Sequence, residues 1–287
     1  MEMDVAGVAF RRIALPDLGL HVAEAGPDSG TPTILLHGFP EFWYGWRHQI
    51  GPLAQAGLRV VAPDQRGYGF SDKPQDLAAY HLDRLAGDVI ALADACGFSK
   101  IRLVGHDWGG LVAWWVASHY PERIERLAIL NAPHPGVVGD YIRTHPGQMV
   151  RSTYVGLFQI PSLPERLLTA DRCRALRRAL TSTSRPGAFA AADLDRYVEA
   201  WRQPGAMTAM LNWYRALVRL PRANPPRVRV PTLILWGRQD TALQAGLAEA
   251  SLTLCDDGRI RWYDRASHWL AHEEPAAVNE DLIAFLA

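Results

Sequence analysis

The sequence lacks the features that would place the chain in a membrane or a secretion pathway. No apolar run approaches the ~18 residues needed to suggest a membrane span. The opening segment, MEMDVAG, has no basic stretch followed by an apolar one, so we expect no secretion signal. Three cysteines, Cys96, Cys173 and Cys255, are far apart and odd in number, which favours reduced thiols over a disulfide framework. These absences predict a cytoplasmic protein.

An excess of charge of either sign is also missing. The 30 basic and 30 acidic residues cancel, so composition gives no electrostatic reason to expect nucleic acid or an anionic membrane surface as partner. The basic run Arg172, Arg174, Arg177 and Arg178 follows helical spacing and is interpreted as a solvated face. With 287 residues, 48% of them hydrophobic, the chain can bury a sizeable core.

Short strand-like runs alternate with longer helical patterns through most of the chain. Mostly apolar runs of this kind predict an α/β fold with a mostly parallel central sheet flanked by helices on both faces. An opening antiparallel hairpin is expected over 8–13 and 20–25. The further expected strands are 33–36, 58–62, 101–104, 124–130, 232–236 and 259–263, and helical segments are expected over 41–56 and 80–96.

The rhythm changes between about Pro133 and Pro226, where strand-like runs vanish and helical segments are punctuated by prolines. We interpret this stretch as a helical cap, or lid, inserted over the carboxyl edge of the sheet. Pro225-Pro226 and Pro231 then mark the return to the core, because successive prolines cannot continue a helix. The predicted organisation is a first core part over 1–132, the cap over 133–226 and a second core part over 227–287.

Asp107 is the most informative candidate residue. In the hexapeptide GHDWGG, 105–110, it follows an expected strand and precedes an expected helix. Ligands of parallel sheets bind beyond the carboxyl ends of the strands, and a sharp turn there lifts the central side chain out of the sheet. A carboxylate in that place can displace a leaving group at a saturated carbon, and the resulting ester must then be hydrolysed. A serine esterase or lipase is disfavoured because no serine occupies the turn.

Asp240 and His268 follow two later strands, which gives the chain order nucleophile, acid, histidine. In such a triad the histidine takes a proton from water, and the acid fixes its tautomer and stabilises the imidazolium. Each residue has a rival interpretation. Asp240 could cap the helix that follows it. His272 competes with His268, and the two at i and i+4 could bind a metal on a helix, although no third ligand is evident.

Three motifs carry a resemblance to a known family: HGFPEFWYGWR over 37–47, DQRGYG over 64–69 and GHDWGG over 105–110. Over nearly its whole length the chain resembles an epoxide hydrolase of the α/β-hydrolase superfamily. The resemblance implies the α/β-hydrolase fold with a helical cap. It also implies oxyanion-binding amides at Phe39 and Trp108, and a cis peptide bond before Pro40. Phe39, Pro40, Trp108 and Phe158 are then expected to line the substrate pocket.

In this family two lid tyrosines donate hydrogen bonds to the epoxide oxygen. The segment LNWYR, 211–215, matches the one that carries the second tyrosine, which assigns Tyr214. The first matches Tyr154, with Tyr141 as its nearest competitor. The implied reaction converts an apolar epoxide and water to a vicinal diol through an Asp107 ester, and it requires no metal or organic cofactor. Oligomeric state stays open, with a homodimer as one alternative.

Dehalogenases are the closest alternative, because haloalkane and fluoroacetate dehalogenases also use an aspartate nucleophile in this fold. Haloalkane dehalogenases commonly hold halide with the tryptophan after the nucleophile and an asparagine after the His-Gly pair. Trp108 fits that pattern, but Phe39 stands where the asparagine would be. The arginines that clamp fluoroacetate would stand at Trp108 and Leu111. A non-catalytic binding protein is a further alternative, and the intact triad argues against it.

Overall fold

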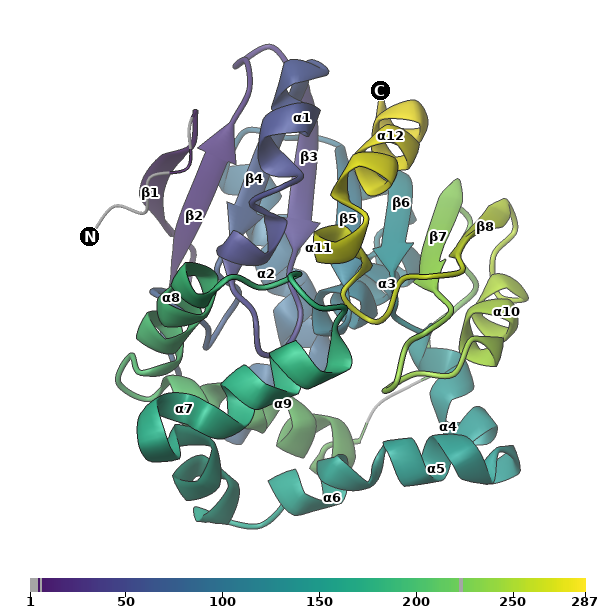
Figure 1. Ribbon diagram of the computed structural model, residues 1–287. Coiled ribbons are helices and arrows are strands. Elements are labelled where there is room, and N and C mark those ends of the chain that lie inside the picture. The colour runs from purple at the N-terminus through teal and green to yellow at the C-terminus, as the bar shows by residue number, and fades with distance from the viewer. Residues whose placement is uncertain (1–4, 6, 222–223) are drawn as a thin grey trace.

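The computed structural model describes residues 5, 7–221 and 224–287, and its strands form one eight-stranded sheet (Figure 1). The order across the sheet is β1-β2-β4-β3-β5-β6-β7-β8. β2 pairs antiparallel with β1 and β4, and all other neighbours are parallel. The strands are β1 (Ala9–Ala14), β2 (Gly19–Ala25), β3 (Thr31–Leu36), β4 (Leu58–Pro63), β5 (Ile101–His106), β6 (Ile124–Leu130), β7 (Thr232–Gly237) and β8 (Gly258–Tyr263). The predicted α/β fold class and opening hairpin are confirmed.

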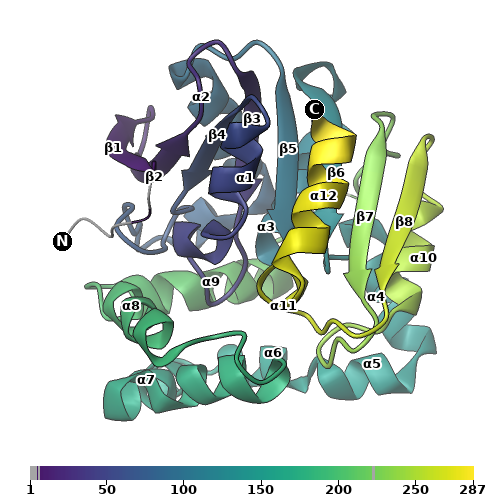
Figure 2. The ribbon, with the colours of Figure 1, turned by 45° about the horizontal axis from the view of Figure 1, so that its top comes forward.

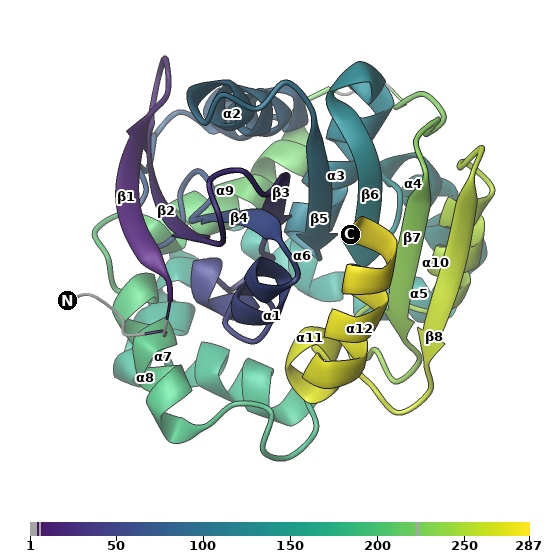
Figure 3. The same cartoon turned by 90° about the horizontal axis from the view of Figure 1, so that it is seen from above.

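Helices cover both faces of the sheet, because parallel neighbours must be joined by crossovers. Figure 3 shows α1 and α12 on one face, and α2 and α3 on the other. The helices outside the segment between β6 and β7 are α1 (Ile50–Gln55), α2 (Leu82–Ala95), α3 (Trp108–His119), α10 (Gly246–Leu252), α11 (Leu270–Glu273) and α12 (Pro275–Leu286), with short 3₁₀ turns η1 (Trp43–Trp46), η2 (Leu77–Tyr80) and η3 (Pro121–Arg123).

The core is packed on both sides of the central strands. Every residue of β7 is buried, as expected for a strand covered on both faces. α3 is apolar and buried almost all round, because it packs on β3, β5, β6 and α2. Four tryptophans of the core are at most 2% exposed: Trp43, Trp46, Trp114 and Trp115.

The helical pattern over 41–56 was only partly right. This stretch forms the 3₁₀ turn η1 and the short helix α1, with other backbone between them. All four residues of η1 are buried, including Gly45. Its apolar residues therefore do not mark one buried face of an amphipathic helix. Tertiary packing, rather than helical periodicity, accounts for the apolar content here.

Between β6 and β7, the described residues up to Leu220 form helices and the loops that join them, and no strand. They are α4 (Pro135–Thr144), α5 (Pro146–Arg151), α6 (Thr153–Phe158), α7 (Leu163–Thr183), α8 (Ala191–Trp201) and α9 (Ala206–Arg219). Figure 2 shows them gathered beyond the carboxyl ends of the strands. α7 is interrupted, because Ala170 to Cys173 have non-helical backbone angles. Within the described residues, no helix is long and apolar enough to cross a membrane.

Candidate active site

Asp107 sits in the turn between the end of β5 and the start of α3. Its backbone has φ 50° and ψ −118°, outside the regions that non-glycine residues ordinarily adopt. Small neighbours make this turn feasible. A Cβ atom at Gly38 would lie 2.4 Å from the Cβ of Asp107, and one at Gly109 would lie 2.2 Å from the carbonyl oxygen of Leu36. The local sequence therefore raises the Asp107 side chain at the carboxyl edge of the sheet.

The three triad residues expected from the sequence come together at this edge. His268 Nε2 lies 3.6 Å from Asp107 Oδ2, and His268 Nδ1 lies 2.7 Å from Asp240 Oδ2. All three follow strands: Asp107 follows β5, Asp240 follows β7 and His268 follows β8. The imidazole therefore bridges the two carboxylates, as nucleophile, base and orienting acid require.

Asp240 is held by hydrogen bonds on both of its oxygens. Its Oδ1 accepts from the backbone N–H groups of Ala242 (2.7 Å) and Leu243 (2.8 Å). Its Oδ2 accepts from the side-chain amide of Asn131 at 2.6 Å as well as facing His268. Asp240 thus caps the turn that follows it and also orients the histidine, so the two interpretations of this residue are compatible.

The carboxylates set the charge of the imidazole. Burial alone would lower the pKa of His268, but the charges of Asp240 and Asp107 and the hydrogen bond to Asp240 raise it well above its usual value. Burial would raise the pKa of Asp240, but His268 and the N–H donors around it lower it. In the resting protein both groups favour their charged forms.

One of the two expected oxyanion donors contacts Asp107 directly. The Phe39 amide donates to Asp107 Oδ1 at 2.8 Å, and the Phe39–Pro40 peptide bond is cis, as expected. Within the described residues, no hydrogen bond joins the Trp108 amide to the Asp107 carboxylate. The two Asp107 oxygens therefore differ, since Oδ1 is bound by an amide and Oδ2 faces His268.

The two candidate lid tyrosines, Tyr154 and Tyr214, lie together beside the turn that carries Asp107. The Tyr214 ring is buried 4.8 Å from Trp108 and 5.2 Å from Phe39, and the Tyr154 ring lies 5.9 Å from it. Tyr154 is 39% exposed. Desolvation of the hydroxyl, followed by the nearby charge of Asp107, raises the pKa of Tyr154 above its usual value. Burial and the neighbouring Tyr154 and Asp107 also raise the pKa of Tyr214 well above its usual value, so both phenols are protonated at neutral pH.

The rival candidates lie elsewhere. Tyr141 stacks on His145 with 3.7 Å between ring centroids, and its hydroxyl lies against Gly246 at the start of α10. His272 Nε2 contacts Glu41 Oε1 at 2.8 Å, and its Nδ1 lies 3.0 Å from Arg47. These contacts of Tyr141 and His272 are with residues other than Asp107.

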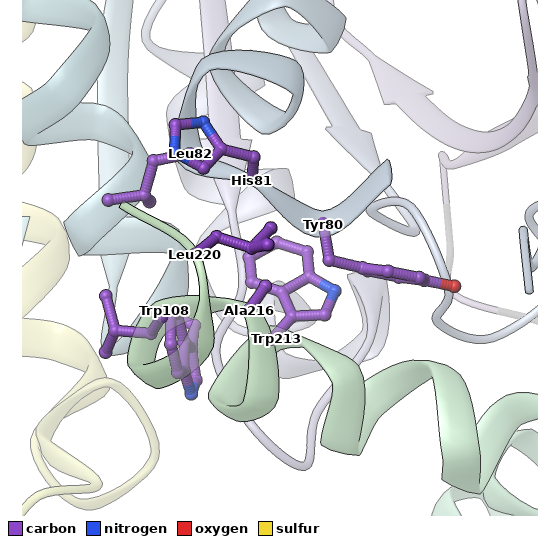
Figure 4. Close-up of a pocket in the computed structure, with 8 residues that line it drawn as sticks. Tyr80, His81, Leu82, Trp108, Trp213, Ala216 and Leu220 are labelled. Atoms are coloured by element: carbon purple, nitrogen blue, oxygen red, sulfur yellow. The ribbon is translucent and has the colours of Figure 1, made fainter. Parts of the chain in front are cut away.

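The side chains expected to line the pocket are also neighbours. Phe158 lies 5.0 Å from Tyr214 and 5.8 Å from Phe39 between ring centroids. Trp108 contacts Tyr214 and additionally lines a small apolar pocket between η2 and α9, where Trp213 and Leu220 lie close to it (Figure 4). Aromatic rings therefore surround the approach to Asp107, which suits an apolar substrate.

A buried polar network behind the triad was missed by the sequence reasoning. Glu41 Oε1 accepts from the Tyr197 hydroxyl at 2.7 Å and contacts His272, and Glu41 Oε2 lies 3.2 Å from His106 Nδ1. His106 Nε2 in turn lies 2.9 Å from the backbone oxygen of His268. Burial would raise the pKa of Glu41, but His272 and His106 hold it well below its usual value. The available signal was adjacency, since Glu41 follows Pro40 and His106 precedes Asp107.

Comparisons with known proteins identify the family and the fold. Residues 31–275 match the family described as alpha/beta hydrolase fold. The chain is 45% identical to AB hydrolase superfamily protein YfhM of Bacillus subtilis (strain 168), over 98% of each chain. It is 40% identical to epoxide hydrolase 4 of Mus musculus, over 96% of this chain and 79% of the relative. A solved epoxide hydrolase of Bacillus megaterium in complex with an inhibitor has a TM-score of 0.88 at 30% identity, covering 96% of this chain and 99% of that chain.

Proposed function

We propose that this chain, which belongs to the epoxide hydrolases of the α/β-hydrolase family, opens its epoxide through a covalent ester on Asp107. The observation that carries the proposal is the unequal environment of the two Asp107 oxygens. Oδ1 is bound by the Phe39 amide, and Oδ2 faces His268 Nε2 at 3.6 Å. In this proposal the helices between β6 and β7 act as the lid over the site.

In the first step Asp107 Oδ2 forms a bond to one epoxide carbon. The carbon–oxygen bond of the ring breaks, and its electron pair moves to the ring oxygen. The phenols of Tyr214 and Tyr154 donate to that oxygen, which takes a proton from one of them. A phenol with a raised pKa stays protonated until a stronger base appears, and the emerging alkoxide is such a base.

In the second step His268 removes a proton from water, and the hydroxide adds to the carbonyl carbon of the ester. Ester formation neutralises Asp107, which removes one of the charges that raise the pKa of His268. With its pKa lowered in this way, His268 can release its proton to solvent in the ester, and the neutral imidazole is the form that accepts a proton from water. The oxyanion forms on Oδ1, where the Phe39 amide and the adjacent Trp108 amide would hold it. Collapse releases the diol, whose leaving oxygen takes the proton back from His268, and leaves Asp107 as a carboxylic acid. That proton returns to the tyrosine that gave one up in the first step, which restores the Asp107 carboxylate and the phenol.

The dehalogenase alternative is not favoured, because relatives that are 40% and 33% identical to this chain, and a solved structure that is 30% identical, are named epoxide hydrolases. A non-catalytic protein would also have no need of an imidazole held between two carboxylates.

The origin of the diol oxygen tests the ester directly. With protein in excess over an aryl epoxide such as styrene oxide, a single turnover in ¹⁸O-labelled water should release unlabelled diol. The label should appear in the peptide that contains Asp107, because water attacks the ester carbonyl. Labelled diol from the first turnover, with an unlabelled peptide, would overturn the covalent route. Asp107→Ala should form no diol, whereas Asp256→Asn, which alters an exposed carboxylate paired with Arg227, should behave as the parent protein.

A further inference from the structure

The chain has no net charge, but two parts of its sequence have net charges of opposite sign. The segment 133–226 contains 13 arginines, no lysine and six acidic residues, whereas the rest of the chain contains 17 basic and 24 acidic residues. The segment 133–226 therefore carries an excess of seven positive charges, and the rest of the chain carries an equal negative excess. The net charge of the whole chain gives no reason to expect an anionic partner. An uneven distribution of charge, however, orients a protein so that its positive side faces such a partner.

The same helices carry an exposed apolar surface, which we call the lid patch. Leu163 and Leu167 lie one turn apart on α7, and Ile160 precedes them in the link from α6. The Arg219 side chain bonds to Gln159, which ties the end of α9 to that link. Figures 1 and 2 show α5, α6 and α7 along the edge of the molecule away from the sheet. The lid patch comprises Met149, Val150, Leu157, Ile160, Leu163, Leu167 and Val218, each between 40% and 69% exposed.

Arginines are interleaved with the lid patch. Arg151 follows Val150, Arg219 follows Val218, and Arg166 lies between Leu163 and Leu167, all exposed. Within the described residues, Arg166 has no acidic partner. Exposed apolar side chains beside guanidinium groups are the combination that binds the headgroup region of an anionic bilayer, where the apolar groups insert and the cations meet lipid phosphates.

We propose that the lid patch docks this protein on an anionic lipid surface. A second copy of the chain is a poorer occupant, because a twofold contact between lid patches would bring together two copies of the segment 133–226, each with an excess of seven positive charges. Docking through the lid patch also keeps the acidic remainder of the chain away from the lipid.

The lid patch adjoins the approach to the site. Tyr154, itself 39% exposed, lies on α6 three residues before Leu157. A docked lid would therefore present the tyrosine end of the site to the bilayer, where apolar epoxides dissolve. This link to substrate supply rests on the proposed function, whereas the docking itself does not.

Vesicle cosedimentation of the full chain tests the docking without any substrate. The probes are vesicles of phosphatidylcholine alone and vesicles of equal parts phosphatidylcholine and phosphatidylglycerol. We expect binding to the anionic vesicles only, weakening as salt is added. Arg166→Gln should lower the partition coefficient about fivefold, the effect of one arginine near an anionic surface. Leu163→Gln/Leu167→Gln should lower it as well, because two inserting side chains are lost.

The matched control is Lys100→Gln/Arg229→Gln, which removes two exposed cations that precede β5 and β7, at the end of the sheet away from the lid helices. It should leave partitioning unchanged. Equal binding to neutral vesicles, no binding to anionic ones, or equal losses in Arg166→Gln and the control would each overturn the proposal. A dimer in sedimentation velocity that Leu163→Gln/Leu167→Gln dissolves, with no vesicle binding, would assign the lid patch to self-association. Failure here with intact ¹⁸O transfer to Asp107 would leave the proposed reaction standing.

Discussion

Replacing Asp240 by asparagine removes one charge while keeping the shape of the side chain. Asp240 Oδ1 accepts from two backbone N–H groups, so the amide oxygen of the variant is expected to take that position. The NH₂ group then faces His268 Nδ1 and the Asn131 amide. Asn131 is itself fixed, because its Oδ1 accepts from the Gly237 N–H at 2.9 Å. A donor now faces Nδ1, so Nδ1 must accept and the imidazole proton moves to Nε2.

The shifted proton blocks the second step more than the first. Nε2 faces Asp107, and once protonated it cannot take a proton from water. A wrong histidine tautomer of this kind, in a serine protease triad, costs on the order of 10⁴ in rate. We expect hydrolysis of the ester to slow by about 10³–10⁴, or about 4–5.5 kcal/mol in its barrier. Attack by Asp107 on the epoxide needs no base, so the ester should form and accumulate.

Rapid mixing followed by intact-mass measurement tests this reasoning. Asp240→Asn should consume about one equivalent of epoxide quickly, release almost no diol, and gain the mass of one substrate molecule. Asp256→Asn is the matched control, because it makes the same chemical change at an exposed carboxylate. If Asp240→Asn keeps more than a tenth of the steady-state rate, or loses activity without gaining mass, the assignment of the tautomer to Asp240 is wrong.

Three further predictions concern groups around the same site. Asp107→Asn should lower the pKa of His268, because it removes a charge 3.6 Å away, and an NMR titration that finds the same pKa in both proteins would contradict this. Tyr214→Phe should slow epoxide consumption in the first turnover about 10²-fold, the effect of losing one oxyanion donor, and an unchanged rate would reject its role. Glu41→Gln should destabilise the protein by about 1–3 kcal/mol in urea unfolding at pH 7, because it disrupts the buried hydrogen bonds that Tyr197 and two imidazoles make to the Glu41 carboxylate. The Glu41 pKa is lowered in the folded state, so its stabilisation is present above the unfolded pKa and lost as pH falls through the folded one. The difference in free energy of unfolding between Glu41→Gln and the parent protein should therefore shrink in acid. A difference that stays constant would count against an ionised Glu41 carboxylate.

The strands, and the grouping of Asp107, Asp240 and His268 at one edge of the sheet, were predictable because each depends on a short stretch of sequence. A buried parallel strand appears as an apolar run, and a residue directly after such a run lies at the ligand-binding edge. The same rule applies to Asn131, which follows β6 and binds Asp240, yet its role was not predicted. An asparagine after a strand acquires that role only from a partner 109 residues away. Glu41 escaped for a similar reason, because two of its partners, Tyr197 and His272, come from distant parts of the chain.

In the proposed reaction the two aspartates have different tasks, and their surroundings differ accordingly. A nucleophile needs an electron pair that no donor occupies. Asp240 accepts from two backbone N–H groups, faces Asn131 and His268, and its side chain is 1% exposed, so its oxygens are committed. Asp107 accepts one N–H bond on Oδ1, and its side chain is 16% exposed. Oδ2 of Asp107 is thus the oxygen left available for attack, and exchanging the roles of the two residues would require rebuilding the turn after β7.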